Sequence, residues 1–162
     1  MTDTTGDVRE LEFIRDYNVS VARLWRAVTA PGEIAKWIGH DDTDILTCEM
    51  DFRARGPWTC IMRGQESGRI FKLTGMVTHV REPDGGEGSV GFTWAWHDAE
   101  TDARGAESHV IFEVSAQRDG ARLRLIHRDL SSEEVAQNHS RGWLATLVRL
   151  DRLIARYSTE EN

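Results

Sequence analysis

The sequence predicts an α+β domain in which a curved antiparallel sheet packs around one long carboxy-terminal helix. From residue 42 to 128, hydrophobic residues alternate with polar ones, which is typical of half-buried strands. Short breaks rich in glycine and proline separate the alternating runs and favour antiparallel links. Beyond them, apolar residues recur at steps of three and four, as on one face of a helix.

The amino-terminal part of the sequence predicts one strand and two short helices. The strand candidate spans residues 10–17. Ser20 follows it and can cap a helix that carries Leu24 and Val28 at helical spacing. Pro31 favours the start of a second short helix, through Trp37, because proline suits a first helical turn and breaks the preceding helix.

The alternating region predicts a meander of short strands. Its links at residues 64–68, 83–86 and 119–120 are typical turn sequences, and Asp119-Gly120 suits a tight hairpin because both residues tolerate positive φ. The apolar positions of the successive runs are Cys48, Met50 and Phe52; Trp58, Cys60 and Met62; Phe71, Leu73, Gly75 and Val77; Val90, Phe92, Trp94 and Trp96; Val110, Phe112 and Val114; Leu123, Leu125 and His127.

The last element is predicted to be a long helix. Ser131 and Glu134 have the spacing of a capping box, and Leu130 and Val135 are placed as a hydrophobic staple. The apolar stripe needs a surface to cover it, and the concave face of the meander is large enough. The residues of the stripe are Val135, His139, Trp143, Leu147, Leu150, Ile154 and Tyr157.

Length and charge limit the class of protein. The chain has 162 residues, which fits one domain over residues 9–157 with polar tails at 1–8 and 158–162. Its 20 Lys and Arg against 27 Asp and Glu give a net charge of −7, which disfavours nucleic acid and anionic membranes as partners. No apolar stretch has the roughly 18 residues of a membrane span, and residues 1–8 carry no export signal, so a cytoplasmic location is expected.

The sequence contains partial matches to cofactor and metal motifs, but the residues around them do not favour binding. Residues 86–91 match GxGxxG, but they open a predicted strand rather than a helix, so we expect a hairpin turn and no dinucleotide. The acidic residues from Asp98 to Asp102 imitate a calcium loop, yet Ala103 replaces the required glycine and His109 the required carboxylate. The histidines lack metal-site spacing. Neither a cofactor nor a metal is expected, and Cys48 and Cys60 are expected to be reduced core thiols.

Two histidines are predicted to lie on apolar faces, where they could have a structural or a ligand-binding role. His127 ends the apolar face of the last predicted strand, and His139 lies on the stripe of the long helix. Each could hydrogen-bond a backbone carbonyl and cap the core, or it could line a cavity and orient a ligand. The tryptophans could likewise fill the core or wall a pocket. An empty void of about 300 Å³ would cost around 7 kcal/mol, so side chains, water or a ligand must occupy the interior.

In its order of motifs, the chain resembles the activator of heat-shock-protein-ninety ATPase homologue family, within the START-like or SRPBCC superfamily. The resemblance implies a helix-grip fold, in which a seven-stranded antiparallel sheet grips the carboxy-terminal helix and two short helices close one end of a cavity. The matching motifs are Trp25 to Pro31, Ile34 to Trp37, Asp51 to Arg53 with Gly56 and Trp58, Gly75, Phe92 to Trp96, Leu123 to His127, and His139 to Trp143 with Leu147 and Leu150.

Relatives in the wider superfamily bind lipids, sterols, polyketides or hormones in this cavity, and some are cyclases. The leading expectation is therefore non-catalytic binding of a small hydrophobic or aromatic molecule. Ile38 and His40 depart from the family pattern near the expected mouth of the cavity, so the identity of the ligand is not predicted from relatives. The family's double glycine is also replaced, by Arg-Gly-Pro at residues 55–57. The expected ligand-binding residues are Trp37, Trp58, Met62, Phe71, Phe92, Trp94, His127, His139 and Trp143.

Two alternative functions are also compatible with the sequence. A cyclase or hydrolase would use one inward histidine as general acid or base, with a partner such as Glu49, Asp51 or Glu113. A co-chaperone module would use the acidic surface. The eukaryotic chaperone activators carry a separate amino-terminal domain that is not found here, so a chaperone is the less favoured partner. A homodimer is compatible with the sequence, which specifies no face for it.

Overall fold

The computed structural model describes residues 9–161 and confirms the α+β helix-grip fold. Seven strands form one antiparallel sheet in the order β1-β7-β6-β5-β4-β3-β2. The elements are β1 (Leu11–Tyr17), α1 (Val21–Thr29), α2 (Pro31–Ile34), β2 (Thr43–Glu49), β3 (Gly56–Gly64), β4 (Ile70–Arg81), β5 (Glu87–Trp96), β6 (Ser108–Gln117), β7 (Gly120–Arg128) and α3 (Glu133–Glu161).

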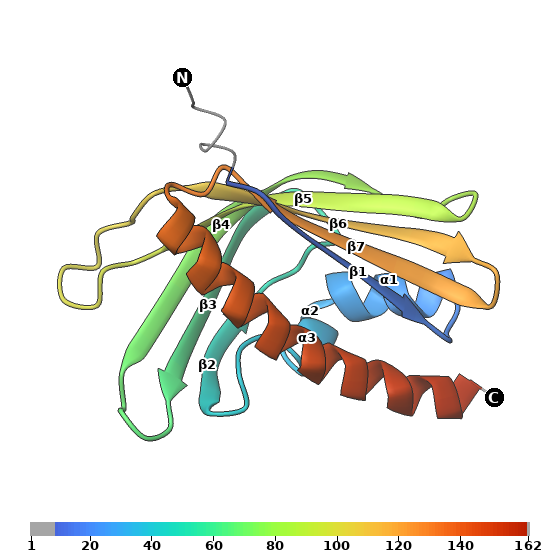
Figure 1. Cartoon of the computed structure of the whole chain (residues 1–162), viewed down its shortest axis with the longest axis horizontal. Helices are drawn as coiled ribbons and strands as arrows, with labels where there is room; N and C mark the ends of the chain where they lie inside the picture. Colours follow the sequence, from blue (N-terminus) through green and yellow to red (C-terminus); the bar gives the residue numbers. More distant parts are fainter. Residues whose placement is uncertain (1–8, 162) are drawn as a thin grey trace.

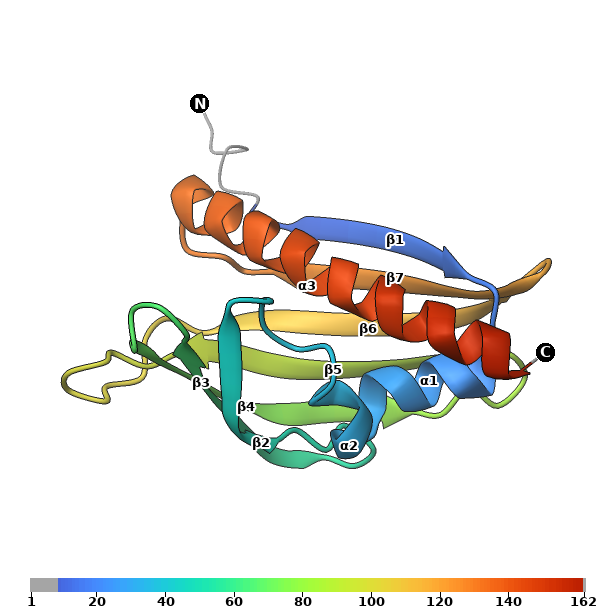
Figure 2. The ribbon, with the colours of Figure 1, turned by 90° about the horizontal axis from the view of Figure 1, so that it is seen from below.

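All three helices lie on the concave side of the sheet (Figures 1 and 2). Strands β2 to β7 form the expected meander, in which each strand pairs with the next in sequence. Strand β1 instead joins the edge of β7, with Leu11 opposite His127 and Tyr17 opposite Ala121. Helix α3 crosses this face as one long rod, so its apolar stripe is covered by the sheet.

Aromatic side chains fill part of the interior. The Phe52 ring stacks on Phe92 with centroids 4.2 Å apart, and Phe92 meets Phe112 edge-on at 5.2 Å. The Trp37 indole lies 6.1 Å from Phe112 and donates to the carbonyl oxygen of Ala27 in α1 at 2.9 Å. The inner space under α1 and α2 is therefore a packed core rather than a cavity.

The short helices begin where the sequence predicts, but the second one is shorter. The Ser20 hydroxyl accepts the backbone N–H of Arg23 at 3.0 Å and caps α1 as expected. Helix α2 starts at Pro31 and ends at Ile34. The prediction that it continues through Trp37 is wrong: the chain turns after Ile34, which lets the Trp37 indole reach back to α1.

The amino-terminal cap of helix α3 lies one residue later than predicted, and the helix begins at Glu133. The Ser132 hydroxyl, not that of Ser131, accepts the backbone N–H of Val135 at 3.1 Å, so the expected capping box is wrong. The preceding Asp129 has φ of 63°, and the N–H of buried Leu130 bonds to Arg9, which fixes how the chain enters the helix. The helix also continues through 158–161, which the sequence places in a polar tail; residues 1–8 lie outside the described residues.

Replacing Ser132 with alanine is expected to destabilise the protein by about 1 kcal/mol, because an amide at the start of α3 loses its acceptor. The matched change at exposed Ser131, whose hydroxyl makes no hydrogen bond within the described part of the chain, should cost much less. Urea denaturation of both variants measures the difference. Equal losses, or a larger loss for Ser131→Ala, would contradict the assigned cap.

The two cysteines are neighbours across β2 and β3. Cys48 lies directly opposite Cys60 in the register of these strands, and both thiols are free. Cys60 is buried in the core as expected, whereas Cys48 on the edge strand is only half-buried. The hydrogen bond with the neighbouring Cys48 thiol and, after it, burial raise the pKa of Cys60, so this thiol stays neutral and packs as an apolar core residue.

Candidate functional site

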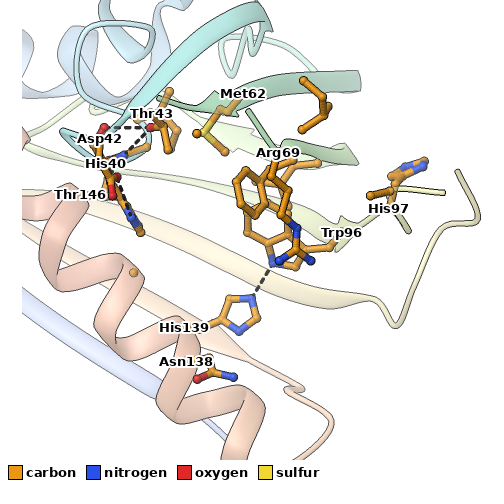
Figure 3. Close-up of a pocket in the computed structure, with 18 of the residues that line it drawn as sticks. His40, Asp42, Thr43, Met62, Arg69, Trp96, His97, Asn138, His139 and Thr146 are labelled. Atoms are coloured by element: carbon orange, nitrogen blue, oxygen red, sulfur yellow. Dashed lines mark hydrogen bonds and ion pairs between the residues drawn. The ribbon is translucent and has the colours of Figure 1, made fainter. Parts of the chain in front are cut away.

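A cavity of about 580 Å³ opens beside the amino-terminal half of α3 (Figure 3). Its lining comes from the loop after α2, from the β3–β4 hairpin, from the end of β5 and the loop that follows, and from one face of α3. This volume lies within the range of small-molecule sites in proteins. The lining is contributed by residues within 38–43, 62–73, 94–99 and 138–146.

Aromatic rings form the walls of this cavity. The indoles of Trp94 and Trp143 have centroids 5.3 Å apart, and Trp94 meets Trp96 edge-on at 6.0 Å. Phe71 on β4 lies 6.3 Å from Trp96. Trp94 and Trp143 are buried, whereas 36% of Trp96 is exposed, which places it at the mouth. Flat, rigid side chains of this kind suit an apolar or aromatic ligand.

His139 lines the cavity, but both of its ring nitrogens are engaged within the protein. Nε2 accepts the indole N–H of Trp96 at 3.1 Å (Figure 3), so Nδ1 carries the proton and donates it to the carbonyl oxygen of Val135 at 2.8 Å. Burial lowers the pKa of His139, and the tryptophan donor on Nε2 also requires the neutral ring. His139 therefore holds Trp96 in place at the mouth.

His127 lies behind the cavity wall and is fully buried. Its Nδ1 accepts the indole N–H of Trp143 at 2.9 Å, so Nε2 carries the proton and donates it to the Ser108 hydroxyl at 2.7 Å. Ser108 in turn donates to the carbonyl oxygen of Trp94 at 3.3 Å. Burial lowers the pKa of His127 to about 3, with His139 adding to the effect. This series of hydrogen bonds fixes two walls of the cavity, Trp143 on α3 and Trp94 on β5.

The indole nitrogen of Trp94 is an exception to this pairing. It is buried and has no hydrogen-bond partner among the described residues. A buried donor without an acceptor costs about 1–3 kcal/mol, so such groups are normally paired with protein, water or a ligand. Since Trp94 lines the cavity, an acceptor atom of a bound molecule or a water there would remove this cost.

The structure divides the nine expected binding residues into two groups. Four lie outside the cavity lining and belong to the packed core or the wall behind it: Trp37, Trp58, Phe92 and His127. The other five line the cavity: Met62, Phe71, Trp94, His139 and Trp143. Strand alternation and helical spacing marked these residues as inward-facing, but such patterns do not show which part of the interior is filled by neighbouring side chains.

Several lining residues were missed by the sequence interpretation. Trp96 continues the inner face of β5, and Thr146 follows Trp143 by one helical turn, so their patterns were detectable. Thr146 donates its hydroxyl proton to the carbonyl oxygen of Gly39 at 2.9 Å and ties α3 to the loop after α2. Arg69 and Asn138 lie outside the apolar patterns, and only the folded chain brings them to the cavity.

The structure does not assemble an acid–base pair on either inward histidine. Among the side chains that the structure describes, no carboxylate hydrogen-bonds to His127 or His139. The suggested partner Asp51 pairs with Arg53 at 2.8 Å, and Glu113 pairs with Arg124 at 2.9 Å. The same described range contains no cluster of three or more His, Cys, Asp or Glu side chains that could hold a metal ion.

A sheet that grips a carboxy-terminal helix around a cavity defines a domain of the START-like superfamily. The family model of the activator of Hsp90 ATPase homolog 1-like proteins matches residues 18–155, and the chain belongs to this family. It is similar to the AHSA1 protein from Silicibacter pomeroyi, with 37% identity and a TM-score of 0.82, over 91% of this chain and 99% of that one.

More distant solved structures share the fold. A protein from Chromobacterium violaceum is 18% identical with a TM-score of 0.75, and the match covers 90% of this chain and 96% of that one. A protein from Mycobacterium smegmatis is 20% identical with a TM-score of 0.72, and the match covers 91% of both chains. A search among curated proteins found no match. In the described part of the chain, no helix is long and apolar enough to cross a membrane.

Proposed function

We propose that this protein binds a small, largely apolar or aromatic molecule in the cavity between α3 and the sheet, without catalysing a reaction on it. One observation carries the proposal: aromatic rings wall a cavity of about 580 Å³, and the buried indole N–H of Trp94 on that wall has no acceptor among the described residues. Apolar walls with a few polar groups are the usual composition of ligand sites. The ligand would cover the rings and accept the Trp94 proton.

Binding is favoured over acid–base catalysis by the state of the two inward histidines. A general base needs a free lone pair facing the substrate. In His139 the lone pair accepts from Trp96, and in His127 it accepts from Trp143. The name of the family refers to Hsp90 ATPase activation, and contact with a chaperone would require an outer surface. The unsatisfied donor lies inside, which supports a small molecule as the partner.

The proposal is tested by thermal denaturation against a library of small aromatic and apolar compounds. A ligand at one hundred times its Kd should stabilise the native protein by about 2.7 kcal/mol, which corresponds to several degrees in Tm. Quenching of tryptophan fluorescence should accompany the shift, because Trp94, Trp96 and Trp143 line the site. If no compound raises Tm, the binding function is wrong.

A variant that fills the cavity provides the control for location. Gly142 lies on α3 at the cavity, and a Cβ there would meet only His40 Nε2, at 3.6 Å, so a side chain can enter the open space. Gly142→Phe should keep the fold and abolish the ligand-induced shift in Tm. Leu144→Phe changes the exposed face of the same helix and should bind as the wild type does. Undiminished binding by Gly142→Phe would place the ligand elsewhere.

A further inference from the structure

Arg69 is a cation on the cavity wall without an acidic partner. It precedes β4, and among the side chains of residues 9–159 no carboxylate lies within ion-pair distance of its guanidinium. The guanidinium carbon stands 5.3 Å from the centroid of Phe71, and Figure 3 shows the side chain turned toward the space between sheet and helix. Many other arginines here are paired, such as Arg63 with Asp44 and Arg149 with Asp41.

The other ionisable side chains near Arg69 at the cavity are bonded within the protein or point into solvent. Asp98 accepts two backbone N–H groups of its own turn at 2.9 Å, and His97 bonds to Thr74 at 2.7 Å. Asp42 points largely into solvent and lies 4.0 Å from His40, at the loop after α2. The Arg69 guanidinium, in contrast, lies over the ring of Phe71, which contacts Trp96 in the aromatic wall of the cavity.

Resting on the proposed function, we propose that the ligand is an amphipathic anion whose apolar or aromatic body lies on the tryptophan wall and whose carboxylate or sulfonate group binds Arg69. A planar guanidinium offers paired donors that match such a group. The ring of Phe71 beneath it limits the motion of the side chain. Because Arg69 is exposed, its ion pair with the ligand would lie near water. We therefore expect this ion pair to improve the affinity for the ligand by about five- to tenfold.

Two fluorescent dyes test this ligand class because they share one skeleton and differ in charge. N-phenyl-1-naphthylamine is neutral, and 8-anilino-1-naphthalenesulfonate adds a single sulfonate. The wild type should bind both with a rise in emission and should bind the sulfonate more tightly, with an affinity that falls as salt is added. Arg69→Gln should weaken sulfonate binding by about five- to tenfold and leave binding of the neutral dye within about twofold.

Arg63→Gln is the matched control, since Arg63 is a nearby exposed arginine that does not line the cavity. It should leave both affinities unchanged. Near-ultraviolet circular dichroism should show that each variant stays folded, and Gly142→Phe should abolish binding of both dyes and so place them in the cavity. If both dyes bind equally well and Arg69→Gln has no selective effect, the anionic ligand class is wrong while the binding cavity stands. If neither dye binds the wild type, the proposed function itself is overturned.

Discussion

Replacing Gly75 with alanine is expected to lower the free energy of unfolding by about 3 kcal/mol, or roughly 10 °C in Tm. Gly75 lies on β4 opposite Trp58, at a point where β4 and β5 depart from regular pairing. A Cβ there would lie 1.9 Å from the carbonyl oxygen of Thr93 and 2.5 Å from the indole nitrogen of Trp58. That oxygen accepts the Trp58 indole N–H at 3.1 Å, so the added methyl group would separate two strands and break a buried hydrogen bond.

The same change at Gly32 provides a control. Gly32 lies in α2, and a Cβ built on it meets no atom within 4 Å. Gly32→Ala should leave stability unchanged or raise it by a few tenths of a kcal/mol, because alanine has less backbone freedom in the unfolded chain. Urea denaturation of both variants measures the contrast. A Gly75→Ala protein as stable as Gly32→Ala would show that β5 can move away from β4 without loss.

Acid is expected to destabilise this protein by roughly 3–6 kcal/mol through His127 alone, at about 1.4 kcal/mol per pKa unit. Its pKa is about 3 in the folded protein, compared with 6.5 for an ordinary histidine. Between these values the unfolded chain binds a proton that the folded protein excludes. The contribution is therefore fully present above pH 6.5 and is lost as the pH falls toward 3. Burial lowers the pKa of His139 as well, which adds in the same direction.

His127→Gln isolates this effect, because glutamine offers an acceptor for Trp143 and a donor for Ser108 but does not titrate. We expect the variant to be less stable at neutral pH, since its shape differs, but to lose much less stability between pH 6.5 and 4. The measurement is the free energy of unfolding in urea at a series of pH values. Curves for the wild type and the variant that run parallel over this range would contradict the assignment of the neutral, buried imidazole.

The local patterns predicted much of the fold for identifiable reasons. The alternation from Cys48 to His127 marks inner and outer faces because strand side chains point to opposite sides, and Ser20 and Pro31 mark helix starts through their own chemistry. The start of α3 was misplaced because Ser131 and Ser132 both suit a cap. Which serine caps depends on the entry of the chain at Asp129, where φ is positive, and on the contact between Leu130 and Arg9.

The candidate site was predicted in its composition but not in its extent. The sequence marked Met62, Phe71, Trp94, His139 and Trp143 as inward-facing, and all five line the cavity. It marked four others in the same way, and these lie elsewhere. Trp37, Trp58 and Phe92 pack against the rings of Phe52 and Phe112 in the core. His127 lies behind the cavity wall, where it bonds to Trp143 and Ser108. The period of a strand reports the face of the sheet, whereas filling depends on side chains from distant elements that meet there.

By itself the sequence determined a sheet with one inward face, a helix with one apolar stripe and two histidines on those surfaces, since periodicity is a property of neighbouring residues. Only the folded protein shows that those histidines are neutral and that both of their ring nitrogens are bonded. It also shows that the Trp94 indole N–H lacks a partner among the described residues and that the Arg69 guanidinium lies over Phe71. These facts depend on distances between segments far apart in the chain, and such distances exist only once the sheet has curved around α3.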